Sequence, residues 1–216
     1  MRIGMIGAGN VGSTLAELLI RAGHDVTLSH QGSPLELRGL VARLGERAYA
    51  GTVEEAARFG DAVVLAIPFG KLGELPREPF TNKIVIDATN YYPERDGDFP
   101  ELREGRVTSS ELTARHLADA RIVKAFNSLP MRVLAERARP RGAPDRIALP
   151  LSSEFPEAKR VVAQLIDQVG FDPIDLDGLA PGGRLHQNGG PLYGRPLTVD
   201  EMRLALGLGG EQPRAS

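Results

Sequence analysis

The feature that most restricts what this chain can fold into is the run MIGAGNVG at residues 5–12. Gly7, Gly9 and Gly12 stand in a G-x-G-x-x-G spacing directly after the apolar segment 2–6. In a strand–turn–helix unit these glycines permit a tight turn, a phosphate close to the backbone, and a helix packed against the strand. The start of the helix, with Asn10 and Val11, supplies free N–H groups and a partial positive charge. The context favours a dinucleotide site over a glycine-rich turn without a ligand.

Short apolar runs recur along the chain and alternate with amphipathic stretches. Their interiors are almost wholly apolar, as expected for parallel strands buried on both faces. The strands are expected at 3–6, 26–28, 62–67, 83–86, 122–126, 147–151 and 171–176, and the helices at 11–22, 34–44, 53–59 and 156–169. This order predicts an α/β fold with a doubly wound, mostly parallel sheet of the Rossmann type. We expect a dinucleotide-binding domain at 1–151 and an extension at 152–216 that completes the sheet and an acceptor pocket, in one compact unit.

Composition excludes several classes of function. The formal net charge of −2 over 216 residues gives no electrostatic case for nucleic acid or an anionic membrane surface as a partner. The chain has no cysteine and four scattered histidines, which excludes thiol chemistry and disfavours a metal site. No apolar run approaches the roughly 20 residues that span a bilayer, and no signal peptide is evident. We therefore expect a cytoplasmic protein.

The residues after the second expected strand indicate which dinucleotide binds. An NAD site usually has Asp or Glu there, which accepts a hydrogen bond from the adenine ribose. This chain has Ser29, His30 and Gln31, and Arg38 follows on the next expected helix. A carboxylate would repel a 2′-phosphate, whereas a hydroxyl, an imidazole and free N–H groups can hold one. The sequence therefore predicts NADP(H), with a plain polar turn as the alternative.

Four motifs in order carry a resemblance to a known family: IGMIGAGNVGSTLAELLIRAGHDVTLS, AVVLAIPF, KIVIDATNYY and RIVKAFNSLP. Together, over about residues 2–206, they resemble the NADP-dependent oxidoreductases typified by archaeal NADPH:deazaflavin (coenzyme F-420) oxidoreductase. The cytosolic domains of six-transmembrane metalloreductases are similar.

The resemblance implies roles for matching positions. Ser29 and His30 would hold the 2′-phosphate, although archaeal relatives have arginine where this chain has His30. The cofactor site would further include Ala66, Ile67, Pro68, Lys71, Ala88, Thr89, Asn90 and Ala125. Asn127 and Leu129 match positions beside the hydride-transfer site, and archaeal relatives have histidine in place of Asn127. That departure leaves the identity of the acceptor open.

Hydride transfer to a flavin-like ring, whether a deazaflavin or FMN/FAD, needs no obligatory acid–base residue, because the cofactor carries the chemistry. Reduction of a ketone or imine would need a proton donor, for which Lys71, Lys124, His186 and Tyr193 are candidates without a pairing pattern. We expect Lys124 to point to an edge or to solvent, and His186 to be a polar loop residue.

The glycine-rich segment 180–197 is expected to be neither helix nor strand. We expect it to form one wall of the acceptor pocket through Arg184 and Tyr193, with the basic segment 137–144 as a rim.

Two other functions remain open. One is a reductase of another small acceptor, of the β-hydroxyacid or pyrroline-carboxylate type, although only about 65 residues follow Leu151. The other is a non-catalytic NADP(H)-sensing module, because a fold alone does not establish a function. The apolar stretch 202–208 is a candidate contact of a homodimer, and the tail 207–216 is expected to fray.

Overall fold

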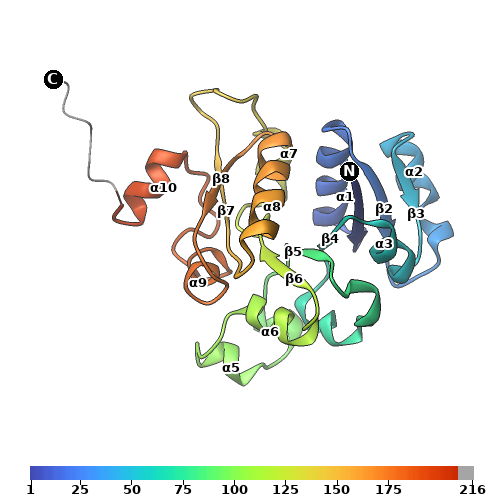
Figure 1. The fold of residues 1–216 in the computed structure, drawn as a ribbon, viewed down its shortest axis with the longest axis horizontal. Helices are drawn as coiled ribbons and strands as arrows, with labels where there is room; N and C mark the ends of the chain where they lie inside the picture. The colour runs from blue at the N-terminus through green and yellow to red at the C-terminus, as the bar shows by residue number, and fades with distance from the viewer. Residues whose placement is uncertain (209–216) are drawn as a thin grey trace.

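A computed structural model describes residues 1–208 of the chain. Its centre is a six-stranded, all-parallel sheet in the order β3-β2-β1-β4-β5-β6, which is a doubly wound arrangement (Figure 1). The strands of this sheet are β1 (Arg2–Ile6), β2 (Asp25–Ser29), β3 (Ala48–Ala50), β4 (Ala62–Leu65), β5 (Ile84–Asp87) and β6 (Arg121–Lys124). The predicted fold class is confirmed.

The apolar strands form because both faces of the sheet are covered. Alternate side chains enter different cores: Val64 of β4 packs in one, and its neighbours Val63 and Leu65 pack in the other. The first core is closed by α1, α7 and α8, and the second by α3 and the segment around α6. The helices on the sheet and in its crossovers are α1 (Asn10–Arg21), η1 (Pro34–Leu37), α2 (Arg38–Leu44), α3 (Val53–Phe59), η2 (Phe69–Glu74), η3 (Glu78–Phe80), α4 (Pro93–Asp96), α5 (Pro100–Arg103), α6 (Ser109–His116), α7 (Met131–Glu136) and α8 (Pro156–Gln168).

All seven expected strands are present, and the sequence missed one. Strand β3 is an edge strand of only three residues that pairs with β2 alone, and its sequence contains no apolar run long enough to indicate a strand. The helix at 53–59 has the predicted bounds, because Thr52 and Glu55 form a capping box at its start. The stretch 34–44 is a 3₁₀ turn, η1, followed by α2.

The last two strands do not extend the main sheet. Strands β7 (Ala148–Leu151) and β8 (Asp172–Asp175) form a parallel pair of their own. One antiparallel bridge, between Lys124 and Ser152, joins this pair to β6. The expected boundary at 151/152 therefore falls between two strands that pair with each other.

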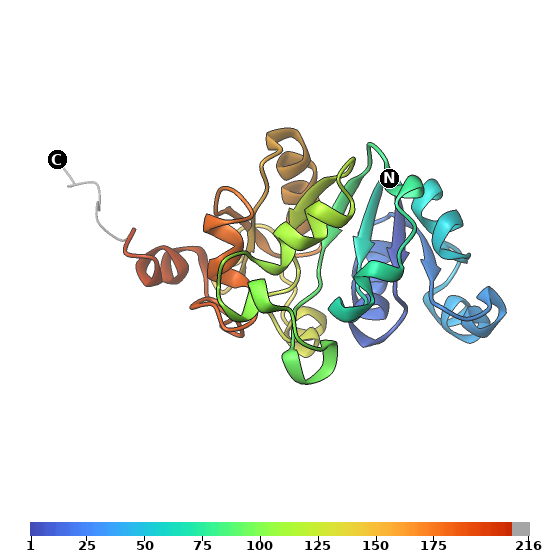
Figure 2. The ribbon, with the colours of Figure 1, turned by 90° about the horizontal axis from the view of Figure 1, so that it is seen from below.

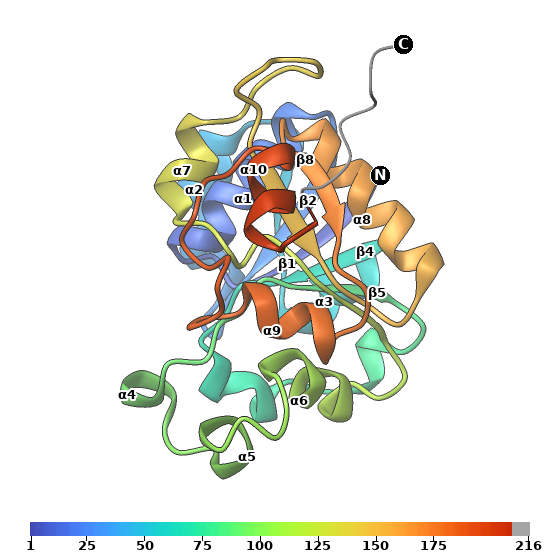
Figure 3. The same ribbon diagram turned by 90° about the vertical axis from the view of Figure 1, so that its left-hand side faces the viewer.

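The segment 180–197 contains a helix, contrary to our expectation. Helix α9 (Pro181–His186) starts at a proline and places Gly182 where no side chain fits: a Cβ there would lie 1.8 Å from the carbonyl oxygen of Leu176. One of the glycines that favoured a loop thus serves close packing. In the view of Figure 3, α9 lies near α6, above α4 and α5.

Helix α10 (Val199–Ala205) lies at the opposite end of the molecule from β3 (Figures 1 and 2). Its Met202 is buried in a small core with Ala148 and Leu192, whereas Leu204 and Leu208 are exposed. The stretch proposed as a dimer contact is therefore partly interior. The expected frayed tail lies outside the described residues from position 209 onward.

No helix within residues 1–208 has the length and apolar character needed to cross a membrane.

Helix α3 lies so close to β1 that residue 4 has to be glycine. A Cβ on Gly4 would stand 2.2 Å from the carbonyl oxygen of Ala56, a backbone atom that moves only with the helix. We expect Gly4→Ala to lower the free energy of unfolding by about 3 kcal/mol in chemical denaturation. The control is Gly73→Ala, whose Cβ would meet nothing within 4 Å. Equal stability of the two variants would contradict this account of the packing.

Candidate functional site

The glycine turn has the geometry that its spacing predicts. Gly7 follows β1 with φ of +107°, and a Cβ there would lie 2.3 Å from the carbonyl oxygen of Ala66. A Cβ on Gly12 would lie 1.9 Å from the carbonyl oxygen of Gly7. Gly9 differs, because a Cβ there would meet nothing within 4 Å. Two glycines are thus required by packing, and the third leaves open space beside the backbone, where a ligand can approach.

The N-terminus of α1 opens onto this space. Gly9 is its N-cap, no side chain caps it, and its first turn has no acidic residue. Helices α3, α6 and α10 instead begin with a Thr–Glu capping box. Unpaired N–H groups and the positive end of the helix dipole make such a terminus a site for a phosphate.

A groove of about 630 Å³ runs from this turn along the carboxyl ends of the strands. It gathers the end of β1, the glycine turn, the loop after β2, the start of α3, and the segment after β4. Of the predicted cofactor residues, those that line it are Gly7, Gly9, His30, Ala66, Ile67, Pro68 and Lys71. Ligands of doubly wound sheets bind at this edge.

The corner expected to take a 2′-phosphate is only partly as predicted. Ser29 is fully buried, and its hydroxyl donates to the carbonyl oxygen of Met5, so it does not present that hydroxyl to the groove. His30 lines the groove, accepts the Gly32 N–H at Nδ1 and donates from Nε2 to the Ser33 carbonyl oxygen. Arg38 begins α2 and does not line the groove.

Two carboxylates also line this groove. Glu74 accepts hydrogen bonds from Lys71 at 2.7 Å and from Gln31 at 2.6 Å, which ties η2 to the loop after β2. Glu54 stands in the first turn of α3. No carboxylate occupies the three positions 29–31. The groove therefore fits a dinucleotide along its length, with a backbone cradle for the pyrophosphate and a histidine where an NAD site usually has an acid.

At the other end of the sheet edge, an amide pair joins the loops after β5 and β6. The Asn90 Nδ2 donates to the carbonyl oxygen of Asn127 at 2.9 Å, and the Asn127 Nδ2 donates to Asn90 Oδ1 at 3.2 Å. The backbone of Phe126, the residue before Asn127, has φ of +61°, a left-handed conformation that is strained for a phenylalanine. Ala88, Thr89, Ala125 and Leu129 are buried around this pair.

Beneath these loops lies a buried ion pair between adjacent strands. Lys124 Nζ stands 3.6 Å from Asp87 Oδ2, and both side chains are fully buried. The lysine also donates to the carbonyl oxygen of Thr89, and Ser110 and Thr113 donate to the carboxylate. The expectation that Lys124 points to an edge or to solvent was wrong, because the bridge to β7 encloses it.

Burial alone would raise the pKa of Asp87, but the Lys124 cation and the hydrogen bonds from Ser110 and Thr89 reverse this effect and hold that pKa below its usual range. Burial lowers the pKa of Lys124, and the Asp87 carboxylate offsets part of that change. The pair is thus a fixed internal dipole below the site and does not touch the groove.

His186 is also buried, contrary to its expected place in a polar loop. Its Nδ1 lies 3.0 Å from Asn127 Oδ1, and its Nε2 lies 3.0 Å from the Ser152 hydroxyl. Because the Asn127 Nδ2 already donates to the carbonyl oxygen of His186, Asn127 Oδ1 must accept from Nδ1–H. Nε2 then accepts from Ser152, so the ring is neutral.

Burial, with a smaller contribution from the Lys124 cation, lowers the pKa of His186 to about 3, and Asp87 opposes this shift only in part. The order Ser152–His186–Asn127 resembles a nucleophile, a base and an orienting group. It has no room for a substrate, because a Cβ on Gly182 would already lie 2.4 Å from Ser152 Oγ. The three residues therefore hold α9 against the loop after β6.

The residues expected around an acceptor lie apart from the groove. Arg184 donates to the carbonyl oxygen of Gly105, and the Tyr193 hydroxyl bonds that of Tyr92. Burial and the bond to Tyr92 raise the pKa of Tyr193. Neither residue lines the groove.

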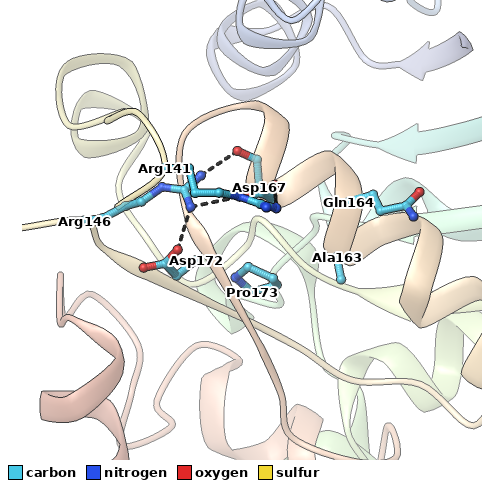
Figure 4. Close-up of a pocket in the computed structure, with 7 residues that line it drawn as sticks. All are labelled: Arg141, Arg146, Ala163, Gln164, Asp167, Asp172 and Pro173. Atoms are coloured by element: carbon cyan, nitrogen blue, oxygen red, sulfur yellow. Dashed lines mark hydrogen bonds and ion pairs between the residues drawn. The ribbon is translucent and has the colours of Figure 1, made fainter. Parts of the chain in front are cut away.

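The basic segment 137–144 does not rim the groove either. Its Arg141 lines a separate cavity of about 380 Å³ between α8 and β8, shown in Figure 4. There Arg141 and the buried Arg146 both pair with Asp167, and Arg146 also pairs with Asp172 at 2.6 Å. These carboxylates neutralise Arg141 and Arg146, which face this cavity and not the groove.

Over residues 1–208, no group of three or more His, Cys, Asp or Glu side chains could hold a metal ion.

Sequence reasoning missed the buried network of Asp87, Ser110, Lys124, Ser152 and His186. The one signal was compositional: Asp87 and Lys124 each close a strand whose other residues are mostly apolar. A charge at the end of a strand usually marks its exit to solvent, so the pattern alone favoured exposure.

Comparisons with known proteins agree with this geometry. Residues 2–91 match a family model described as NADP oxidoreductase coenzyme F420-dependent. The chain is 33% identical to a hypothetical protein from Sinorhizobium meliloti, with a TM-score of 0.79 over 93% of this chain and 96% of that chain. It is 25% identical to an Arthrobacter protein described as an F420-dependent NADP reductase, with a TM-score of 0.70 over 83% and 86% of the two chains.

A more distant likeness concerns the fold alone. A 3-hydroxyisobutyrate dehydrogenase from Mycobacterium tuberculosis is 18% identical, with a TM-score of 0.56, and the match covers 84% of this chain but 56% of that one. No curated protein sequence matches the chain.

The open space at Gly9 provides a test of the cradle. We expect Gly9→Ala to leave the melting temperature unchanged and to weaken NADPH binding at least tenfold in calorimetry, since the new methyl group occupies the space that a pyrophosphate needs. Gly39→Ala is the matched control, because a Cβ there also meets nothing within 4 Å but lies on α2, outside the groove. Equal NADPH affinity for the two variants would remove the pyrophosphate from this turn.

The neutral, buried His186 predicts a pH dependence of stability. The unfolded chain binds a proton near pH 6.5, which the folded chain takes up only near pH 3, so stability falls as pH decreases through this window. We expect His186 to contribute a loss of about 2 kcal/mol in unfolding free energy between pH 7.5 and pH 5. Chemical denaturation at both pH values should show a flatter dependence for His186→Gln.

The pKa of a second histidine, His24, is also lowered. Both the reference protein and the His186→Gln variant therefore carry His24→Gln, so that His24 does not contribute to the difference between them. The same slope with and without His186 would contradict the assignment of a buried neutral ring.

Proposed function

The chain belongs to the family of coenzyme F420-dependent NADP oxidoreductases, and we propose that it transfers a hydride between NADP(H) and a flavin-like acceptor, a deazaflavin or FMN/FAD. The observation that carries this proposal is the groove along the strand ends, which begins at the open face of Gly9 and the uncapped N-terminus of α1. NADPH supplies the hydride when it is bound, and the protein supplies position and shelter from water.

Each part of the groove has a proposed role. The glycine turn and the first N–H groups of α1 hold the pyrophosphate. His30 and Gln31 take the 2′-phosphate end, and Gln31 and Lys71 hold the Glu74 carboxylate beside it. Ile67 and Pro68 form an apolar wall for the nicotinamide half, and Lys71 stands beside them. Asn90 and Asn127, fixed by their paired amides, border the hydride-transfer position with Leu129.

The side-chain chemistry near the site supports a ring-to-ring transfer. Reduction of a carbonyl or an imine needs a proton donor at the reacting atom. His186 is fully buried and engaged at both nitrogens, and Lys124 is buried beside Asp87. Neither can deliver a proton to a substrate in the groove, and Lys71, the candidate that does line it, is paired with Glu74. Two stacked rings require only distance, orientation and exclusion of water.

The test is oxidation of NADPH, followed spectrophotometrically, against a panel of deazaflavin, FMN, FAD and riboflavin, with NADH run in parallel. We expect turnover with at least one flavin-like acceptor and at least a tenfold preference for NADPH in kcat/KM. NADPH binding without oxidation by any acceptor of the panel would instead identify a sensing module. Equal use of NADH would remove His30 and Gln31 from the role given to them.

A further inference from the structure

A further cavity lies beside the loop after β5. It measures about 320 Å³ and shares no lining residue with the groove. Its apolar wall comes from Tyr91, Pro93 and Leu102. Its polar wall comes from Arg103, Ser109, Gln187 and Asn188, which brings α5, α6 and the segment after α9 together. We name it the Ser109 cavity.

Ser109 has an unsatisfied hydroxyl. The residue is 2% exposed, and its Oγ has no hydrogen-bond partner within residues 1–208. A buried hydroxyl without a partner is unfavourable, and native structures contain few of them. Ser109 lines the cavity, and its hydroxyl can turn to a ligand there without breaking a hydrogen bond. The structure thus holds a donor that a ligand in the cavity would satisfy.

Two amides beside Ser109 add one donor and one acceptor. Gln187 Oε1 accepts the Ser109 N–H at 3.2 Å, so its Nε2 is the group left for a ligand. Asn188 Nδ2 donates to the carbonyl oxygen of Tyr91 at 3.0 Å, which leaves its Oδ1 as an acceptor. The polar wall therefore offers a hydroxyl donor, an amide donor and an amide acceptor.

The charges around the cavity are balanced. Arg103 pairs with Asp98, and its second nitrogen lies 3.8 Å from Glu104. Because these carboxylates neutralise the guanidinium, the wall does not select an anion. Donors and an acceptor on a neutral wall suit an uncharged group that carries both C=O and N–H, such as an imide.

A chain of hydrogen bonds links one residue of the cavity, Asn188, to the proposed hydride-transfer position. The Asn188 backbone N–H donates to Asn90 Oδ1 at 3.2 Å, and Asn90 pairs with Asn127. A ring held in the Ser109 cavity by its polar edge would have to extend past Asn90 to reach the nicotinamide. At about 320 Å³ the space is near the lower end for ligand pockets, enough for one end of a fused ring system.

We propose that the Ser109 cavity binds the imide edge of the acceptor, the C=O–N–H–C=O side of its pyrimidinedione ring. This inference rests on the proposed function and specifies the acceptor end of the same site. Ser109 and Gln187 donate to the two carbonyl oxygens, and Asn188 Oδ1 accepts the N–H between them. Tyr91, Pro93 and Leu102 cover the apolar part of the ring.

The experiment measures the dissociation constant of lumiflavin, an isoalloxazine without a ribityl chain, by fluorescence quenching with the full chain. We expect Ser109→Ala to weaken binding about fivefold, the size expected for one neutral hydrogen bond. Ser109→Thr keeps the hydroxyl and is expected to bind like the parent. Lumiflavin methylated at N3, which cannot donate to Asn188, should bind the parent protein at least tenfold more weakly.

The fold and the cofactor site provide the controls. Ser109→Ala removes only an unpartnered hydroxyl, so its melting temperature should equal or exceed that of the parent, and its affinity for NADPH should not change. Equal binding of lumiflavin by the parent and Ser109→Ala, or no loss on N3 methylation, would overturn the inference, as would the absence of lumiflavin binding. Failure of the proposed function is a separate result, seen as no NADPH oxidation with any acceptor although lumiflavin binds.

Discussion

The buried pair of Asp87 and Lys124 is the interaction on which the arrangement of the site depends. It joins the ends of β5 and β6, and through Ser110, Thr113 and the Thr89 carbonyl oxygen it also fixes α6 and the loop after β5. Removing two charges from water is costly, and loss of one partner of such a pair typically costs about 3–5 kcal/mol because the other charge stays buried. The pair therefore tolerates little displacement of either strand end. It thereby also fixes the positions of the loops that follow β5 and β6.

The two halves of the site are built by different physical means. The pyrophosphate end depends on the absence of side chains: Gly7 and Gly12 allow backbone to touch backbone, and Gly9 leaves space. The other end depends on side-chain hydrogen bonds, through which Asn127 connects the loop after β6 to Asn90 and to His186. The first half is rigid because it is close-packed. The second half is held because Asn90, Asn127 and His186 hydrogen-bond one another, which leaves neither ring nitrogen of His186 free for acid–base chemistry.

Much of the fold could be predicted because its signals are local. A parallel strand buried on both faces is a continuous apolar run in the sequence. The start of α3 also has a local cause, the capping box that Thr52 and Glu55 form. The failures also have local causes. Strand β3 was too short to show a pattern, and the glycines of α9 indicated a loop although Gly182 is there for close packing against Leu176. Lys124 and His186 were placed outside because a lone charge or imidazole is usually exposed.

The sequence by itself determined the doubly wound sheet, the glycine turn between β1 and α1, and the lack of an acid at positions 29–31, since each of these is written in neighbouring residues. Only the tertiary structure decided that Ser29 bonds Met5, that Lys124 faces Asp87, and that His186 meets Asn127 and Ser152. Asn127 and His186 are 59 positions apart in the sequence, so no local sequence pattern predicts the contact between them. Whether a polar side chain can be buried depends on a partner that the rest of the chain brings to it, and that partner is known only once the chain has folded.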